Sequence, residues 1–197
     1  MKSLLKAIAL ATVVSCFAVP SIVSAAGPIH FKTHLKGVNE VPPNATRGTG
    51  ELTATISADR LSITYTLTYS NLEGTNPGIG GNRLLFAHFH LGLGRETGGV
   101  MVFLCDNSGK APVGVPLCPD DGTGSGTVMN GTITKDDVVG PGAQGILKEG
   151  AGGAAETAAD AFGEVLKAIE EGASYTNVHT QTFPGGEIRG QNRHSED

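Results

Sequence analysis

The chain has 197 residues, of which 39% are hydrophobic and 17% charged, and its formal net charge is −5. This composition is too apolar for a disordered chain and too polar for a polytopic membrane protein. The negative net charge and the 5% content of aromatic residues argue against a nucleic-acid-binding surface. Glycine contributes 29 residues and proline 10, which favours short strands joined by turns over long helices.

The first 26 residues have the pattern of a secretory signal peptide. Two lysines precede an apolar stretch, residues 7–19, and small residues at 24–26 mark the expected cleavage site. Such a leader is removed on export. We therefore expect residues 27–197 to form a single domain that is secreted or periplasmic and has no membrane span.

Two alternatives to a cleaved leader remain open. The apolar stretch could persist as a membrane anchor, although Pro20 interrupts it and it is barely long enough to span a bilayer. Alternatively, the sequence that ends at Cys16 resembles a lipobox, which would attach a lipid to that cysteine. The residues after Cys16 are still apolar, which argues against lipid attachment.

Alternation of apolar and polar residues predicts β-strands along most of the first two thirds of the domain. In residues 61–69, leucine, isoleucine and tyrosine alternate with serine and threonine, which predicts one buried and one solvated face. Asp59-Arg60 is expected to connect this strand to the one before it as a hairpin. The predicted strands are residues 29–35, 51–56, 61–69, 84–93, 100–105 and 126–133.

The last third contains one helix and a second hairpin. Apolar residues recur at helical spacing within residues 154–171, and Gly172 supplies a stop. A lead-in rich in glycine and alanine, residues 150–155, precedes the helix, which we expect to cover one end or edge of the sheet. Residues 175–182 and 187–191 follow as strands. About seven strands and one inserted helix predict an all-β sandwich.

Two cysteines remain once the leader is removed. In an oxidising compartment Cys105 and Cys118 are expected to form a disulfide bond, which closes a loop outside the sandwich. A closed loop of about 14 residues contributes on the order of 3 kcal/mol to stability. The alternative is a reactive or metal-binding pair, for which Lys110 is the nearest basic residue.

Two histidines flank a phenylalanine in the predicted strand at residues 84–93. Side chains two positions apart leave the same face of a strand, so His88 and His90 can bind one metal ion through bonds of about 2.0–2.1 Å. Ala87 and Phe89 would then face the core. The alternative is a pair of histidines that only form hydrogen bonds on a polar sheet face.

A third histidine strengthens the metal hypothesis. His179 lies on the predicted strand at residues 175–182 and would complete a three-histidine site with an open position, which suits one copper or zinc ion per chain. The sequence does not establish whether its ring faces the pair. His34 is a candidate fourth ligand, whereas His30 and His194 are expected to be solvated.

Four segments of the domain together form a recognisable pattern. They are Gly37-Val38-Asn39-Glu40-Val41-Pro42-Pro43, Ala87-His88-Phe89-His90, Tyr175-Thr176-Asn177-Val178-His179-Thr180 and Pro184-Gly185-Gly186-Glu187-Ile188-Arg189-Gly190-Gln191. With these segments the chain resembles the CHRD domain, over about residues 30–191. The resemblance implies an immunoglobulin-like antiparallel β-sandwich, which is similar to copper/zinc superoxide dismutase. Superoxide-dismutase-like activity is the enzymatic alternative, but a complete ligand set for a second metal is not evident.

The charged residues of these segments are Glu40, Glu187 and Arg189. In one interpretation a carboxylate–guanidinium pair fastens the first loop to the last strand, because arginine binds carboxylates in a bidentate geometry. In the other, one of the glutamates holds a ring nitrogen of a metal-binding histidine.

Two functions from different classes follow. The first is an exported metal-binding protein that uses His88, His90 and His179. The second is a non-catalytic interaction module at the cell surface or in the periplasm, in which the histidines are structural. In that case the loops at residues 74–82 and 106–125 would contact an extracellular or periplasmic protein.

Overall fold

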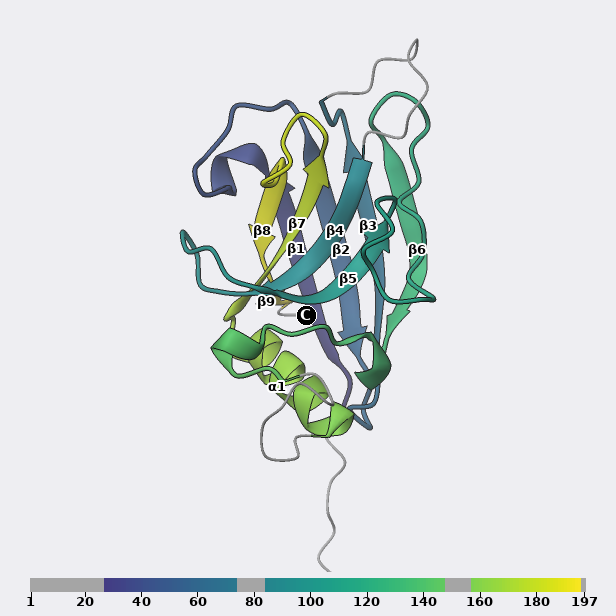
Figure 1. Cartoon of the computed structure of the whole chain (residues 1–197), viewed down its shortest axis with the longest axis vertical. Coiled ribbons are helices and arrows are strands. Elements are labelled where there is room, and N and C mark those ends of the chain that lie inside the picture. The colour runs from purple at the N-terminus through teal and green to yellow at the C-terminus, as the bar shows by residue number, and fades with distance from the viewer. Residues whose placement is uncertain (1–26, 74–83, 148–156, 196–197) are drawn as a thin grey trace, which may run out of the picture.

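The computed structural model describes residues 27–73, 84–147 and 157–195, and within them the chain is mostly β-structure with one α-helix (Figure 1). The expected leader at residues 1–26 and the lead-in at 150–155 lie outside the described residues. The strands are β1 (Ile29–Lys36), β2 (Thr49–Ile56), β3 (Ile63–Ser70), β4 (Leu84–Leu91), β5 (Val100–Asp106), β6 (Gly126–Ile133), β7 (Ser174–Thr180), β8 (Ile188–Gln191) and β9 (Arg193–His194), and the helix is α1 (Ala158–Glu170).

The strands form one antiparallel sheet in the order β5-β4-β7-β8-β1-β2-β3-β6, with β9 paired to β1. The two ends of this path, β5 and β6, contact each other, and Val102 of β5 bridges to Val138, which follows β6. The sheet therefore curls into a nearly closed, barrel-like shape. The prediction of an antiparallel all-β fold is confirmed, but the two-layer sandwich is wrong, because strand pairing continues without a break from β5 to β6.

The core lies on the inner face of this curled sheet. Strands β1 and β3 alternate between buried and exposed residues, as the sequence predicts. The predicted hairpin is formed by β2 and β3, which pair along their full length. Leu61 departs from the prediction: it belongs to the turn, its backbone N–H donates to Asp59, and its side chain is 68% exposed. Fully buried core residues include Phe31, Leu35, Leu52, Ile56, Ile63, Leu67, Phe89, Met101 and Leu104.

Helix α1 lies across one end of the curled sheet (Figure 1). It begins after Thr157, whose hydroxyl accepts the N–H of Asp160 while the Asp160 carboxylate accepts from Thr157. Gly172 ends it in the left-handed conformation, as expected. One side of the helix is buried, with Phe162, Val165, Leu166 and Ile169 against the core. At 13 residues, α1 is too short to cross a bilayer, and no other described helix is long and apolar enough to do so.

Cys105 and Cys118 form the predicted disulfide bond and are both buried. After Asp106, the last residue of β5, the chain forms an irregular loop up to Cys118. The Asp106 carboxylate organises the start of this loop by accepting backbone N–H groups from Ser108, Lys110 and Ala111.

Candidate metal centre

Strands β4 and β7 are neighbours in the sheet, and they bring the three predicted histidines together. In the antiparallel register His88 lies opposite Asn177 and Phe86 lies opposite His179. Residues that face each other across a ladder share one side of the sheet. His179 is therefore on the same face as His88 and His90, which is the placement that the sequence alone could not establish.

The three rings converge closely enough to share an ion. One ring nitrogen from each histidine lies within 4.8 Å of the others. His90 Nε2 and His88 Nδ1 are 3.2 Å apart. Two nitrogens bound to one tetrahedral ion at about 2.0–2.1 Å lie about 3.3–3.4 Å from each other. The pair on β4 thus has a spacing close to that of two ligands of one ion, and a ring nitrogen of His179 lies within 4.8 Å of both.

Backbone carbonyls fix the orientation of two of the rings. His90 Nδ1 lies 2.8 Å from the carbonyl of Gly98, and His179 Nδ1 lies 3.0 Å from the carbonyl of Pro184. A carbonyl only accepts, so each Nδ1 must donate its proton and each neutral ring keeps a lone pair on Nε2. His179 Nε2 is buried and has no hydrogen-bond partner. A buried lone pair without a donor is available to coordinate a metal ion.

Burial keeps the histidines neutral. Burial first, and then the neighbouring His179 and His90, lower the pKa of His88 to about 2, while the Asn177 side-chain amide acts in the opposite direction. Burial likewise lowers the pKa of His179 to about 4 and lowers the pKa of His90. Neutral imidazole is the form that binds metals, so the cluster needs no deprotonation at neutral pH.

Aromatic rings enclose the cluster. Between ring centroids, Phe86 lies 4.6 Å from His88 and 4.7 Å from His179, and Phe103 lies 4.5 Å from His88 in a T-shaped arrangement. Tyr175 stacks on His90 at 4.7 Å with the ring planes 5° apart. The histidines therefore lie in an aromatic pocket on the sheet face opposite the core, and each of the three is at most 7% exposed. The alternative of histidines that only form hydrogen bonds stays a prediction.

The loop after β4 forms one wall of this pocket, and Arg189 of β8 holds it. The Arg189 guanidinium donates to the carbonyl of Leu93 at 3.0 Å and lies 3.4 Å from the centroid of the Tyr175 ring. Gly98, at the end of the same loop, donates its N–H to the Tyr175 hydroxyl and accepts from His90. Arg189 thus positions the loop and the ring that orient His90.

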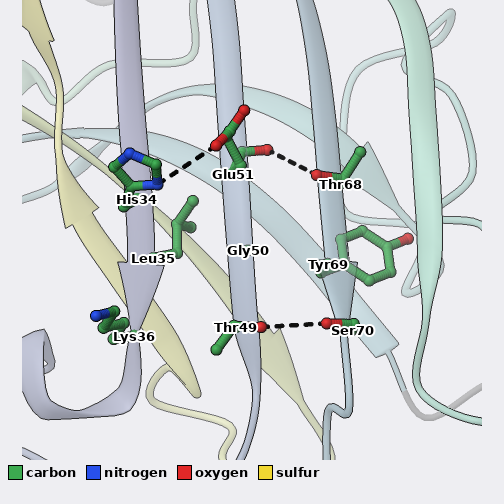
Figure 2. Close-up of a pocket in the computed structure, with 9 residues that line it drawn as sticks. All are labelled: His34, Leu35, Lys36, Thr49, Gly50, Glu51, Thr68, Tyr69 and Ser70. Atoms are coloured by element: carbon green, nitrogen blue, oxygen red, sulfur yellow. Dashed lines mark hydrogen bonds and ion pairs between the residues drawn. The ribbon is translucent and has the colours of Figure 1, made fainter.

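His34 lies elsewhere. It is on the outer face of β1, its ring is directed toward Glu51 of β2 at 3.4 Å, and it borders a shallow polar depression over β1, β2 and β3 (Figure 2). The structure therefore does not bring His34 to the cluster as a fourth ligand. His30 and His194 are exposed near the chain ends, as expected.

The two glutamates have different surroundings. The Glu187 carboxylate accepts hydrogen bonds from Thr46, Glu73 and Thr180 and so ties three segments together. Burial raises the pKa of Glu40 to about 7, against the lowering effect of the Arg189 charge. A direct carboxylate–guanidinium pair stays a prediction. The orienting partners of His90 and His179 are the carbonyls described above.

Four residues of the pocket were not predicted from the sequence: Phe86, Phe103, Tyr175 and Asn177. Three of them lie at positions two or four residues from a histidine on β4 or β7, so the period of the strand could have identified them. Asn177 is the polar residue among the four. Its Oδ1 is buried beside His88 and His90 and has no hydrogen-bond partner.

The donor set defines the chemistry. Within the described residues the cluster contains three imidazoles and neither a thiol nor a carboxylate. Three neutral nitrogens suit zinc or copper and leave a coordination position open, whereas calcium and magnesium prefer oxygen ligands.

Comparison with known proteins identifies one family. Residues 31–192 match the model of the CHRD domain. No curated protein and no solved structure matches the chain.

Proposed function

This chain belongs to the CHRD domain family, and from that premise we propose that it is an exported protein that binds one copper or zinc ion through His88, His90 and His179. The main support is the buried Nε2 lone pair of His179, which has no hydrogen-bond donor and lies next to two imidazoles already spaced as ligands of one ion. A bound ion would satisfy this nitrogen, which otherwise carries the cost of an unpaired buried acceptor.

The surrounding residues prepare the site for the ion. The carbonyls of Gly98 and Pro184 hold the protons on Nδ1 of His90 and His179, which directs both Nε2 atoms to the centre. Phe86, Phe103 and Tyr175 exclude water from the rings. A copper or zinc ion would supply Lewis acidity, and copper would add a one-electron redox step.

Export rests on two observations. The sequence predicts a signal peptide, and the structure forms the disulfide Cys105–Cys118, which persists in an oxidising compartment. We therefore propose a secreted or periplasmic location.

Metal analysis of the purified, metal-free chain without a histidine tag tests the proposal. After incubation with micromolar Zn²⁺ or Cu²⁺ and removal of free ions, we expect about one ion per chain by mass spectrometry. The His88→Ala/His90→Ala variant should retain no ion, and His179→Gln should bind at least about tenfold more weakly, since loss of one ligand weakens a three-ligand site.

The matched control is His34→Ala, which removes an exposed histidine outside the cluster. It should bind as the wild type does. Circular dichroism establishes that each variant is folded. Absence of uptake by the folded wild type at micromolar metal would overturn the proposal.

One observation favours the alternative interaction module. In the loop between the two cysteines, Val113 and Leu117 are 103% and 72% exposed, and exposed apolar side chains on a stapled loop suit contact with another protein. Residues 74–82, the other loop considered for such contacts, lie outside the described residues. Zinc or copper uptake that is lost when the cluster histidines are replaced would favour the metal-binding function over the interaction module.

A further inference from the structure

A second cavity lies on the outer side of β1 and β8, near the loop that follows β4. Its volume is about 700 Å³, within the range of pockets that hold small molecules. It is separate from the histidine cluster: Arg189 lines it, and the Tyr175 ring lies between that guanidinium and His90.

Positive charge is concentrated in this cavity. Lys32, Arg95, Arg189 and Arg193 all line it, and Glu40 is the acidic residue among its lining residues. The chain as a whole has a net charge of −5. The cavity therefore has the opposite sign from the molecule, and an anion would be drawn to it.

The strand register places two of these cations against each other. Lys32 of β1 lies opposite Arg193 of β9 in the antiparallel ladder. Like charges at opposed positions destabilise a sheet. Lys32 offsets part of this cost through its ion pair with Glu51 at 2.9 Å, whereas Arg193 has no ion pair among the residues that the structure describes. A bound anion would relieve the repulsion.

Two buried charged residues line the cavity, and one of them has a polar atom without a hydrogen-bond partner. Arg189 is 2% exposed, and its hydrogen bond goes to a neutral carbonyl, that of Leu93. Glu40 is 6% exposed, and its Oε1 accepts no hydrogen bond. Because burial raises the pKa of Glu40 to about 7, this carboxyl neutralises the neighbouring cations only in part at neutral pH.

We propose that this cavity binds a small molecule with at least two oxyanion groups, of the carboxylate or phosphate type. Guanidinium groups bind both kinds of oxyanion through paired hydrogen bonds, and Arg95, Arg189 and Arg193 offer three of them around one space. The protonated Glu40 can donate to the same ligand, and Val38 and Pro43 provide an apolar side for its carbon skeleton.

Isothermal titration calorimetry of the metal-free protein tests this proposal. Citrate serves as the carboxylate probe and pyrophosphate as the phosphate probe, both at low ionic strength, where charge interactions are least screened. We expect one of them to bind with one-to-one stoichiometry, and the tighter probe identifies the chemical type. The variant Arg95→Gln/Arg193→Gln should raise its dissociation constant at least about tenfold.

Two controls make the result specific. Lys36→Gln removes an exposed cation from the same strand but outside the cavity, and it should leave the dissociation constant within about twofold of the wild-type value. His179→Gln, which removes a cluster histidine whose ring contacts are with Phe86, His88 and His90, should also leave binding unchanged and so separates this site from the metal centre. The proposal is overturned if neither probe binds, if Lys36→Gln weakens binding as much as the double arginine variant, or if His179→Gln abolishes it.

Discussion

Burial has opposite consequences for the two kinds of titratable residue near the site. The histidines have a lower pKa in the folded protein than in the unfolded chain, so protonation favours unfolding as the pH falls below about 6.5. Glu40 has a higher pKa in the folded protein, so its ionisation favours unfolding as the pH rises above about 4.5. Because three histidines outweigh one carboxyl between these pH values, together these residues favour a stability maximum near neutral pH.

The Glu40 contribution predicts a measurable pH dependence. Its pKa rises from 4.5 to about 7 on folding, so the folded state binds more protons than the unfolded state between these values and stability falls as the pH rises. Glu40→Gln mimics the protonated acid and removes this loss. We expect the variant to match the wild type at about pH 4 and to exceed it by about 2 to 3 kcal/mol at about pH 8, by urea denaturation at both pH values.

An exposed carboxylate provides the comparison. Glu164→Gln on the outer side of α1 should leave the free energy of unfolding unchanged at both pH values. If Glu40→Gln is instead less stable than the wild type at the higher pH, the ionised carboxylate is required beside Arg189, and the ion pair predicted from the sequence would outweigh the cost of burial.

Strand periodicity allows much of the histidine cluster to be predicted from the sequence. The spacing of His88 and His90 is enough to place both rings on one face of β4, and the burial of Phe89 on the other face agrees with this. Strand β7 gives a weaker signal, because all seven of its residues are buried and no alternation marks its faces. The position of His179 depends on the pairing of β4 with β7, which joins segments far apart in the chain.

The curvature of the sheet could not be predicted for a related reason. Alternation shows which residues of a strand face the core, but it is the same in a sandwich and in a barrel. In this chain β1 pairs with both β2 and β8, so the strands form one continuous sheet and are not divided into two layers. Bulges in β5 and β6, opposite Ala87/His88 and Tyr65/Leu67, bend the sheet further.

The junction of β1 and β8 depends on a close approach of backbones at Gly190. A Cβ atom there would lie 2.3 Å from the carbonyl oxygen of His34 and 2.5 Å from Thr33 Cγ2. We expect Gly190→Ala to lower the free energy of unfolding by about 2 to 3 kcal/mol, because the strands must separate to admit the methyl group. Thermal and urea unfolding measure the loss.

The same substitution in α1 provides the contrast. Gly163 is exposed in the helix, and a Cβ atom there would meet no atom within 4 Å. Gly163→Ala should therefore raise stability by about 0.5 to 1 kcal/mol, since alanine favours the helix. A loss of similar size in both variants would contradict the proposed steric role of Gly190.

At the scale of the whole molecule, the nearly closed sheet has two edges that must be kept together. The Tyr65 hydroxyl of β3 donates to the carbonyl of Leu104 on β5. The disulfide joins Cys105 of β5 to Cys118, in the segment that leads into β6. Asn107 adds hydrogen bonds to the backbone of Cys118. These contacts hold the β5 edge near β6 where no continuous ladder does so.

The disulfide is expected to provide a large share of this closure. Cys105→Ala/Cys118→Ala frees a loop with a sequence separation of 13 residues, and loops of this length lose about 3 kcal/mol of stability without their cross-link. Urea denaturation of the wild type with dithiothreitol should show a similar loss, while the double variant should not respond to the reductant. If the urea midpoint of the reduced wild type is unchanged, the contacts of Tyr65 and Asn107 hold the two edges together without the disulfide. The disulfide would then indicate an oxidising compartment without contributing to the stability of the fold.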